Sequence, residues 1–107
     1  MTAISTDAYS IPEEFQDFRA TIRDLVEGVV APRAAEIDAK GEYPWDIRKA
    51  FAEHDLLGLP FPEELGGTGT GTLVLNIAIE EVARACASSA LILMVQELGT
   101  LPIQLHG

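Results

Sequence analysis

The sequence predicts an all-α fold, an up-and-down helical bundle of four to five helices. Apolar residues recur at spacings of three and four, which is the period of one helix face. Prolines stand where helices begin or break, and short glycine-containing connections separate the apolar segments. No run of alternating apolar and polar residues is long enough for a strand. With 107 residues, the chain is one domain at most.

The first predicted helix begins close to Ser10 and Glu13, which have the spacing of a capping box. Pro32 removes a helical hydrogen bond and should end or kink this helix near Val30. A weaker helical pattern resumes and stops at Gly41, so we expect one broken helix or two helices in line. The apolar stripe consists of Phe15, Phe18, Ile22, Leu25, Val26, Val29 and Val30.

The second predicted helix opens at Pro44, because the first turn of a helix tolerates a missing backbone N–H. Gly58 is its predicted C-terminal cap. The stretch Leu57–Gly71 follows, and neither helix nor strand periodicity explains it. Its two prolines and four glycines predict a rigid connector, and the alternative is a connector that also faces a ligand. Its GTGTG run follows no strand and lacks the lysine of a phosphate-binding loop, so it is a weak phosphate motif.

The third predicted helix runs from Leu73 to about Ala87, with Thr70 or Thr72 as its N-terminal cap. Glu80 and Glu81 are adjacent on it. Paired carboxylates occur in helical di-metal sites, but the Glu-x-x-His motif of those sites does not follow. We therefore expect these two glutamates to belong to a solvated face.

The last predicted helix is capped by Ser88 or Ser89 and stops at Gly99, after which Pro102 begins another short turn. Its residues Ala90–Val95 are apolar on every face. A helix of this kind is either central to a core or lines an apolar pocket.

Composition excludes several classes of function. Acidic residues outnumber basic ones by 17 to 7, and a net charge of −10 repels nucleic acid. Cys86 is the single cysteine, and the sequence holds no Cys/His cluster for a metal. Residues 1–9 are small and polar, which predicts a flexible N-terminus ahead of a domain spanning 10–107. This segment also lacks the charge and hydropathy pattern of a signal peptide. No apolar run reaches the length of a membrane span, so we expect a cytoplasmic protein.

Three blocks of the sequence resemble the N-terminal helical domain of acyl-CoA dehydrogenases. They are LLGLPFPEELGGTGTG, then IAIEEVARACASSA, and then QELGTLPIQLHG, in that order. The segment IPEEFQDFRATIRDLVEGVVAPRAAEID is similar to the first helix of that family. The resemblance covers nearly the whole chain from Ile11 to Gly107. Leu65 departs from the family pattern, which usually has a tyrosine at this position. Leucine lacks the tyrosine hydroxyl and any hydrogen bond that it would make, but the turn itself depends on the glycines and should be unaffected.

The resemblance implies a fragment of a three-domain flavoenzyme. In that family, FAD takes a hydride from the β-carbon of an acyl-CoA thioester, while a carboxylate base removes the α-proton. Electrons leave to an electron-transferring flavoprotein, and the enzyme is usually a homotetramer. The catalytic glutamate and most flavin contacts come from later parts of such a chain. The resemblance therefore implies no catalytic residue within these 107 residues.

The resemblance also implies a substrate-binding role for the last helix. In the family, the helix before the LG-x-x-P motif lines the cavity for the acyl tail. Carried over by that motif, the side chains facing the tail are Leu91, Met94, Val95 and Leu98. Apolar side chains suit this role, and the absence of charge at these four positions favours an unfunctionalised acyl chain. The alternative for each is an ordinary place in the core.

Two hypotheses about the whole chain remain. The first is the N-terminal part of an acyl-CoA dehydrogenase, inactive by itself and without flavin. The second is a free-standing helical protein-interaction module, or an inactive remnant of the same fold. Leu101, Ile103 and Leu105 form an apolar ending with nothing to pack against, which favours truncation and predicts self-association.

Overall fold

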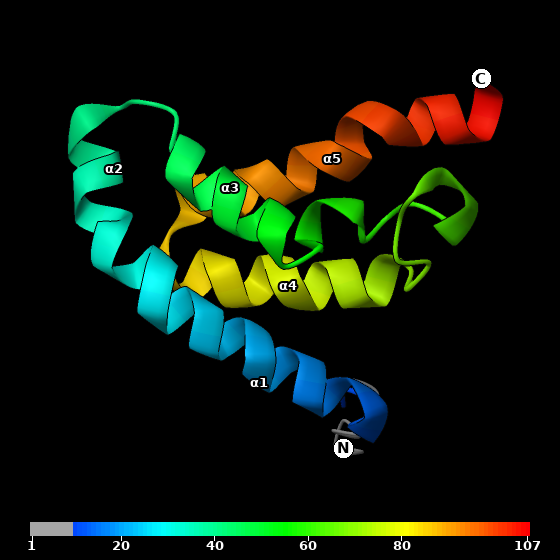
Figure 1. Cartoon of the computed structure of the whole chain (residues 1–107), viewed down its shortest axis with the longest axis horizontal. Coiled ribbons are helices and arrows are strands. Elements are labelled where there is room, and N and C mark those ends of the chain that lie inside the picture. The colour runs from blue at the N-terminus through cyan, green and yellow to red at the C-terminus, as the bar shows by residue number, and fades with distance from the viewer. Residues whose placement is uncertain (1–9) are drawn as a thin grey trace, which may run out of the picture.

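The computed structural model describes residues 10–107, which form five α-helices and no strand (Figure 1). The all-α prediction is therefore confirmed. The segment 1–9, predicted to be flexible, lies outside the described residues. The helices are α1 (Gln16–Leu25), α2 (Ala34–Lys40), α3 (Trp45–Glu53), α4 (Thr72–Ala85) and α5 (Ala87–His106).

Helices α1 and α2 form one bent rod along the outside of the bundle (Figure 1). Between them, Val26–Val30 form a π-helical turn and Ala31–Arg33 form a 3₁₀ turn. Pro32 cannot donate a helical hydrogen bond, which accounts for the irregular winding at this point. Val30 nevertheless stays fully buried, so the apolar stripe continues through the break. The break predicted near Val30 is confirmed.

Helix α3 begins directly after Pro44, as predicted, but it ends earlier than Gly58. The chain leaves the helix through His54 and Asp55, and Asp55 adopts a left-handed conformation with φ of 60°. Gly58 instead belongs to a separate 3₁₀ turn, Leu56–Gly58. The prediction that it caps the helix is wrong.

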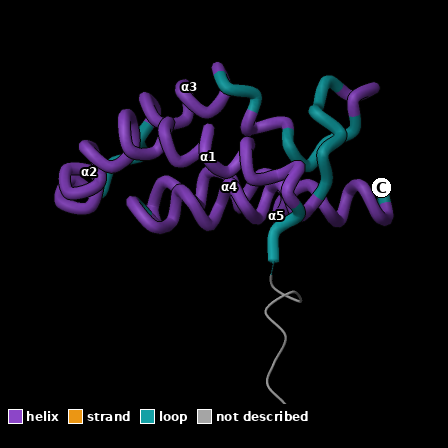
Figure 2. The backbone as a smooth tube through the Cα atoms, turned by 90° about the horizontal axis from the view of Figure 1, so that it is seen from below, coloured by secondary structure: helices purple, strands orange, loops and turns teal. Residues whose placement is uncertain are grey.

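The connector between α3 and α4 folds back on itself, as loop and short helical turns (Figure 2). Leu56 and Leu59 are buried and anchor it to the core. The N–H of Gly67 donates to the carbonyl of Pro62 at 3.0 Å, and a Cβ at Gly67 would overlap the carbonyl oxygen of Phe61. The backbone packs against itself at this point so closely that only glycine fits.

Neither predicted threonine caps α4. Gly71 precedes the helix without a side-chain cap, and the hydroxyl of Thr70 bonds that of Thr68 at 2.8 Å. Thr72 is itself the first residue of α4, so it stands one position too late to cap the helix.

Helices α4 and α5 run antiparallel, and Cys86 alone joins them (Figure 1). Its extended backbone makes the reversal, and its Sγ accepts from the N–H of Ser89 at 3.4 Å and from the Ser89 hydroxyl at 3.2 Å. The cysteine therefore caps α5, in place of the predicted serine.

Helix α5 continues past Gly99 and Pro102 to His106, so the predicted stop at Gly99 is wrong. Both residues lie on the exposed second half of the helix. There water can satisfy the carbonyl that Pro102 leaves without a helical donor. The hydroxyl of Thr100 also bonds the carbonyl of Gln96 on the preceding turn.

The core lies where α1, α3, α4 and α5 meet. Among the described residues, no helix is both long enough and apolar enough to cross a membrane. The largest fully buried apolar side chains are Ile47, Phe51, Leu75, Leu93, Val30 and Val82.

Candidate functional site

An open apolar groove of about 500 Å³ lies between α4 and the second half of α5. Both walls are helical, so each side chain that faces the groove is fixed by its position on a helix. Its mostly apolar surface suits a ligand without charge. The lining residues are Thr72, Asn76, Ile79, Met94, Glu97, Leu98 and Leu101.

The four residues that the sequence nominated for an acyl tail are all exposed. Leu91 is 53% exposed, Met94 43%, Val95 50% and Leu98 70%. They are therefore not core residues within the described chain. Met94 and Leu98 line the groove, while Leu91 and Val95 are not among its lining residues. The side of α5 that faces the core is formed by Ser89, Ala90, Ile92 and Leu93, and the four nominated residues lie on its other sides. Met94 and Leu98 share the side that borders the groove.

The sequence analysis missed two apolar residues of the groove, Ile79 and Leu101. Leu98 lies four positions after Met94, and Leu101 lies three positions after Leu98, so all three fall on one helix face. Extending the helical pattern past Gly99 would therefore have identified Leu101. The predicted helix stop at Gly99 hid this signal. Ile79 comes from a separate helix, and no local pattern connects it to Met94.

Polar side chains border the groove as well. Thr72 and Asn76 come from the first turns of α4, and Glu97 comes from α5. The four positions nominated from the sequence carry no charge, but Glu97, which also lines the groove, is acidic. A carboxylate here disfavours a negatively charged tail and leaves neutral chains unaffected.

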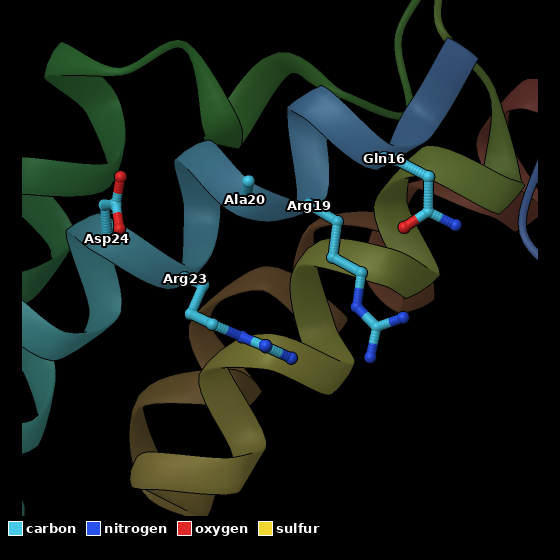
Figure 3. A pocket seen from close by; sticks show the side chains of 5 residues that line it. All are labelled: Gln16, Arg19, Ala20, Arg23 and Asp24. Atoms are coloured by element: carbon cyan, nitrogen blue, oxygen red, sulfur yellow. The ribbon is translucent and has the colours of Figure 1, made fainter. Parts of the chain in front are cut away.

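On the other side of α4, Glu81 is buried and binds three arginines, so its predicted place on a solvated face is wrong. Its side chain is 2% exposed. Oε1 accepts from Arg19 Nε at 2.7 Å and from Arg23 Nη2 at 3.0 Å. Oε2 accepts from Arg23 Nε and from Arg84 Nη1, both at 3.1 Å. We call these four residues the Glu81 cluster; Figure 3 shows Arg19 and Arg23 reaching from α1 across α4.

The cluster keeps Glu81 charged. The hydrogen bonds from Arg23 and then from Arg19 outweigh the effect of burial and lower the pKa of Glu81 to about 2. A carboxyl group with this pKa is ionised at neutral pH, and its oxygens are already engaged. Glu81 is therefore a poor general base and no general acid, and its role is to join α1 to α4.

The glycine-rich connector does not fit the pyrophosphate of a dinucleotide cofactor. The space next to the Gly67 backbone is occupied by Phe61, and Gly69 packs against the side chain of Glu63. The hollow beside the connector is bordered by Asp55 and contains no arginine or lysine. Within residues 10–107, no three His, Cys, Asp or Glu side chains gather as a metal site requires.

Comparison with known proteins identifies the family. Residues 12–107 match the family model described as acyl-CoA dehydrogenase, N-terminal domain. A probable acyl-CoA dehydrogenase fadE25 of Mycobacterium leprae is 41% identical over 101 residues, which cover 94% of this chain and 26% of the relative. A cyclohex-1-ene-1-carbonyl-CoA dehydrogenase of Geobacter metallireducens is 44% identical over 86 residues, which cover 80% of this chain and 22% of the relative.

A third relative comes from an animal. The mitochondrial short-chain specific acyl-CoA dehydrogenase of Mus musculus is 41% identical over 85 residues, covering 79% of this chain and 21% of that protein. The chain thus spans about a quarter of the length of the curated relatives that it matches. Together with the all-helical fold, the match over residues 12–107 shows that this chain belongs to the acyl-CoA dehydrogenase family, as its N-terminal domain.

Proposed function

We propose that this chain supplies one wall of the acyl-chain site of an FAD-dependent acyl-CoA dehydrogenase. The observation that carries the proposal is the apolar groove between α4 and α5, in which Met94 and Leu98 project from one helix and Ile79 from the other. Their side chains are partly or largely exposed in the chain by itself. An apolar tail laid along them would leave water at a gain of about 0.8 kcal/mol for each buried CH₂ group.

The lining of the groove suits an unfunctionalised tail of variable shape. Met94 has three rotatable bonds and a polarisable sulfur, so it can follow an irregular chain. Glu97 at the border would repel an acyl tail that ends in a carboxylate. These features support fatty acyl groups over dicarboxylic ones.

In this proposal, the redox chemistry is carried out by the parts of a complete acyl-CoA dehydrogenase that this chain does not cover. FAD, when bound, accepts the hydride that leaves the acyl chain, and the glycine-rich connector of this chain offers no cradle for its pyrophosphate. We therefore assign no catalytic residue to this chain and expect it to be colourless and inactive after purification. The electron-transferring flavoprotein as acceptor and the tetrameric assembly belong to the same proposal for the complete enzyme.

A chimaeric enzyme tests the proposal. Residues 12–107 would replace the matching segment of the Mycobacterium leprae relative, and acyl-CoA oxidation would be followed by bleaching of the flavin. Met94→Lys places a charge in the groove, so kcat/KM should fall by about 10–100-fold. Leu91→Lys is the matched control, because Leu91 is exposed on the same helix but outside the groove lining. Equal losses in the two variants, or none, would contradict a role for the groove.

A further inference from the structure

The Glu81 cluster carries more positive charge than its one carboxylate neutralises. Three guanidinium groups surround Glu81, which leaves an excess of two positive charges within the cluster, and the nearby carboxylate of Glu27 offsets part of this excess at Arg23. This excess stands out in a chain whose net charge is −10. The ion pairs around Arg33 are balanced by comparison, because Arg33 and Lys40 face the carboxylates of Glu36 and Asp46.

The arginines also have unused donors. A guanidinium group carries five N–H bonds. Among the described residues, Arg19 donates through Nε alone, which leaves both of its terminal NH₂ groups, and Arg23 donates through Nε and Nη2, which leaves Nη1. The side chains of Arg19 and Arg23 are 32% and 41% exposed, so these donors are within reach of a ligand from water.

The free donors border a hollow on the surface of α1. It measures about 290 Å³ and is lined by Arg19 and Arg23 together with Gln16, Ala20 and Asp24. Figure 3 shows the amide of Gln16 beside the guanidinium group of Arg19, while the carboxylate of Asp24 points away from both arginines. The hollow thus brings two guanidinium groups and an amide to one place, with its carboxylate turned outward.

We propose that this hollow binds a phosphate group of a small soluble molecule, held by both terminal NH₂ groups of Arg19 and by Nη1 of Arg23. Guanidinium groups match the oxygens of phosphate through paired hydrogen bonds. Two guanidinium groups on one hollow can pair with three or four phosphate oxygens, whereas a carboxylate offers only two oxygens. A polyanion such as nucleic acid or an anionic membrane would meet the whole acidic surface and be repelled, whereas a small ion meets mainly the local charge.

The test follows the arginine Nε–H signals of the ¹⁵N-labelled 107-residue chain by NMR, with inorganic phosphate added at constant ionic strength. The signals of Arg19 and Arg23 should shift and saturate, and that of Arg33 should not. Acetate, as a singly charged carboxylate, should bind more weakly. Shifts of equal size at Arg33, equal binding of acetate, or a failure to saturate would overturn the proposal.

A negative charge inserted next to Arg19 should weaken phosphate binding without breaking the cluster. Gln16→Glu is nearly isosteric and lies at the first position of α1, where a carboxylate is compatible with the helix. The added charge should weaken phosphate binding about tenfold at low salt. Gln104→Glu makes the same substitution at another exposed glutamine that donates one side-chain hydrogen bond, and it should bind as the wild type does. Equal affinity of the two variants would overturn the site.

A final arm separates a soluble phosphate from a lipid headgroup. The chain would be sedimented with phosphatidylglycerol vesicles, and with neutral vesicles as the control. We expect no binding to either kind at physiological salt. Sedimentation with the anionic vesicles, without an NMR response to inorganic phosphate, would overturn the assignment to a small soluble molecule.

Discussion

Helix α4 has two contacts of opposite character. Toward α1 it buries Glu81, which satisfies its charge with three arginines of the same chain. Toward the second half of α5 it leaves an open groove whose apolar side chains are not covered by any residue of the described range 10–107. In the first contact the carboxylate finds all of its partners within these residues, while the second contact leaves space for a ligand or for more protein. The difference separates what holds this domain together from what it offers to the rest of an enzyme.

The largest effect on stability is expected from Glu81→Gln. This change leaves three guanidinium groups without the carboxylate that they share. We expect a loss of about 2–3 kcal/mol in the free energy of unfolding, below the usual cost of breaking a buried ion pair because the arginines can reach water. Urea denaturation of the variant measures the loss. Glu80→Gln, at the exposed neighbour, is the control and should change little; equal effects would mean that the cluster does not hold α1 to α4.

The stabilisation by Glu81 should depend on pH in the acidic range. Its pKa is lowered from 4.5 to about 2 in the folded chain, so unfolding at low pH takes up a proton. The contribution is complete above about pH 4.5 and is lost as the pH falls towards 2. The stability difference between the wild type and Glu81→Gln should therefore narrow over this range, as urea titrations at each pH would record. A difference that stays constant with pH would show that ionisation of Glu81 contributes nothing.

A smaller effect is expected at the turn between α4 and α5. Cys86→Ala removes the sulfur that accepts from the N–H and hydroxyl of Ser89, and the loss of this cap should cost about 1 kcal/mol. Cys86→Ser keeps an acceptor and should cost less. Thermal unfolding of both variants gives the comparison. If serine proved as costly as alanine, packing of the buried sulfur would matter and capping would not.

The smallest effect is expected from the ion pair between Arg33, just before α2, and Asp46 of α3. Asp46→Asn removes the carboxylate that accepts from Arg33 Nε and Nη2, both at 2.8 Å. About half of the Asp46 side chain is exposed, so solvent screens the pair and the midpoint of urea unfolding should hardly change. A loss as large as that of Glu81→Gln would remove the distinction between buried and exposed clusters.

Sequence periodicity was sufficient for the elements that depend on local chemistry. The stripe of α1 follows from the spacing of its apolar residues, of which Val29 alone is exposed. The break before Pro32 and the start of α3 after Pro44 follow from the hydrogen bond that each proline cannot donate. Periodicity did not predict that α5 continues through Pro102. At an exposed helix end, a carbonyl that loses its helical donor can bond to water instead, so the proline costs little there.

The sites were harder to predict because they join distant residues. Glu81 lies 62 residues after Arg19 and 58 after Arg23, so nothing near it in the sequence marks it as buried. Two of the groove residues, Met94 and Leu98, were nominated through the family resemblance. Ile79 was not, because only the packing of α4 on α5 places it beside them.

The chain-length preference of the chimaeric enzyme tests the central claim most directly. Met94→Trp would fill part of the groove, whereas Leu91→Trp adds the same bulk outside its lining. If the groove holds the acyl tail, Met94→Trp should lower kcat/KM for long acyl-CoA substrates by about 10–100-fold and spare the shortest ones. Leu91→Trp should leave the profile unchanged. An identical profile for Met94→Trp and the unsubstituted chimaera would contradict the assignment of the acyl chain to this groove.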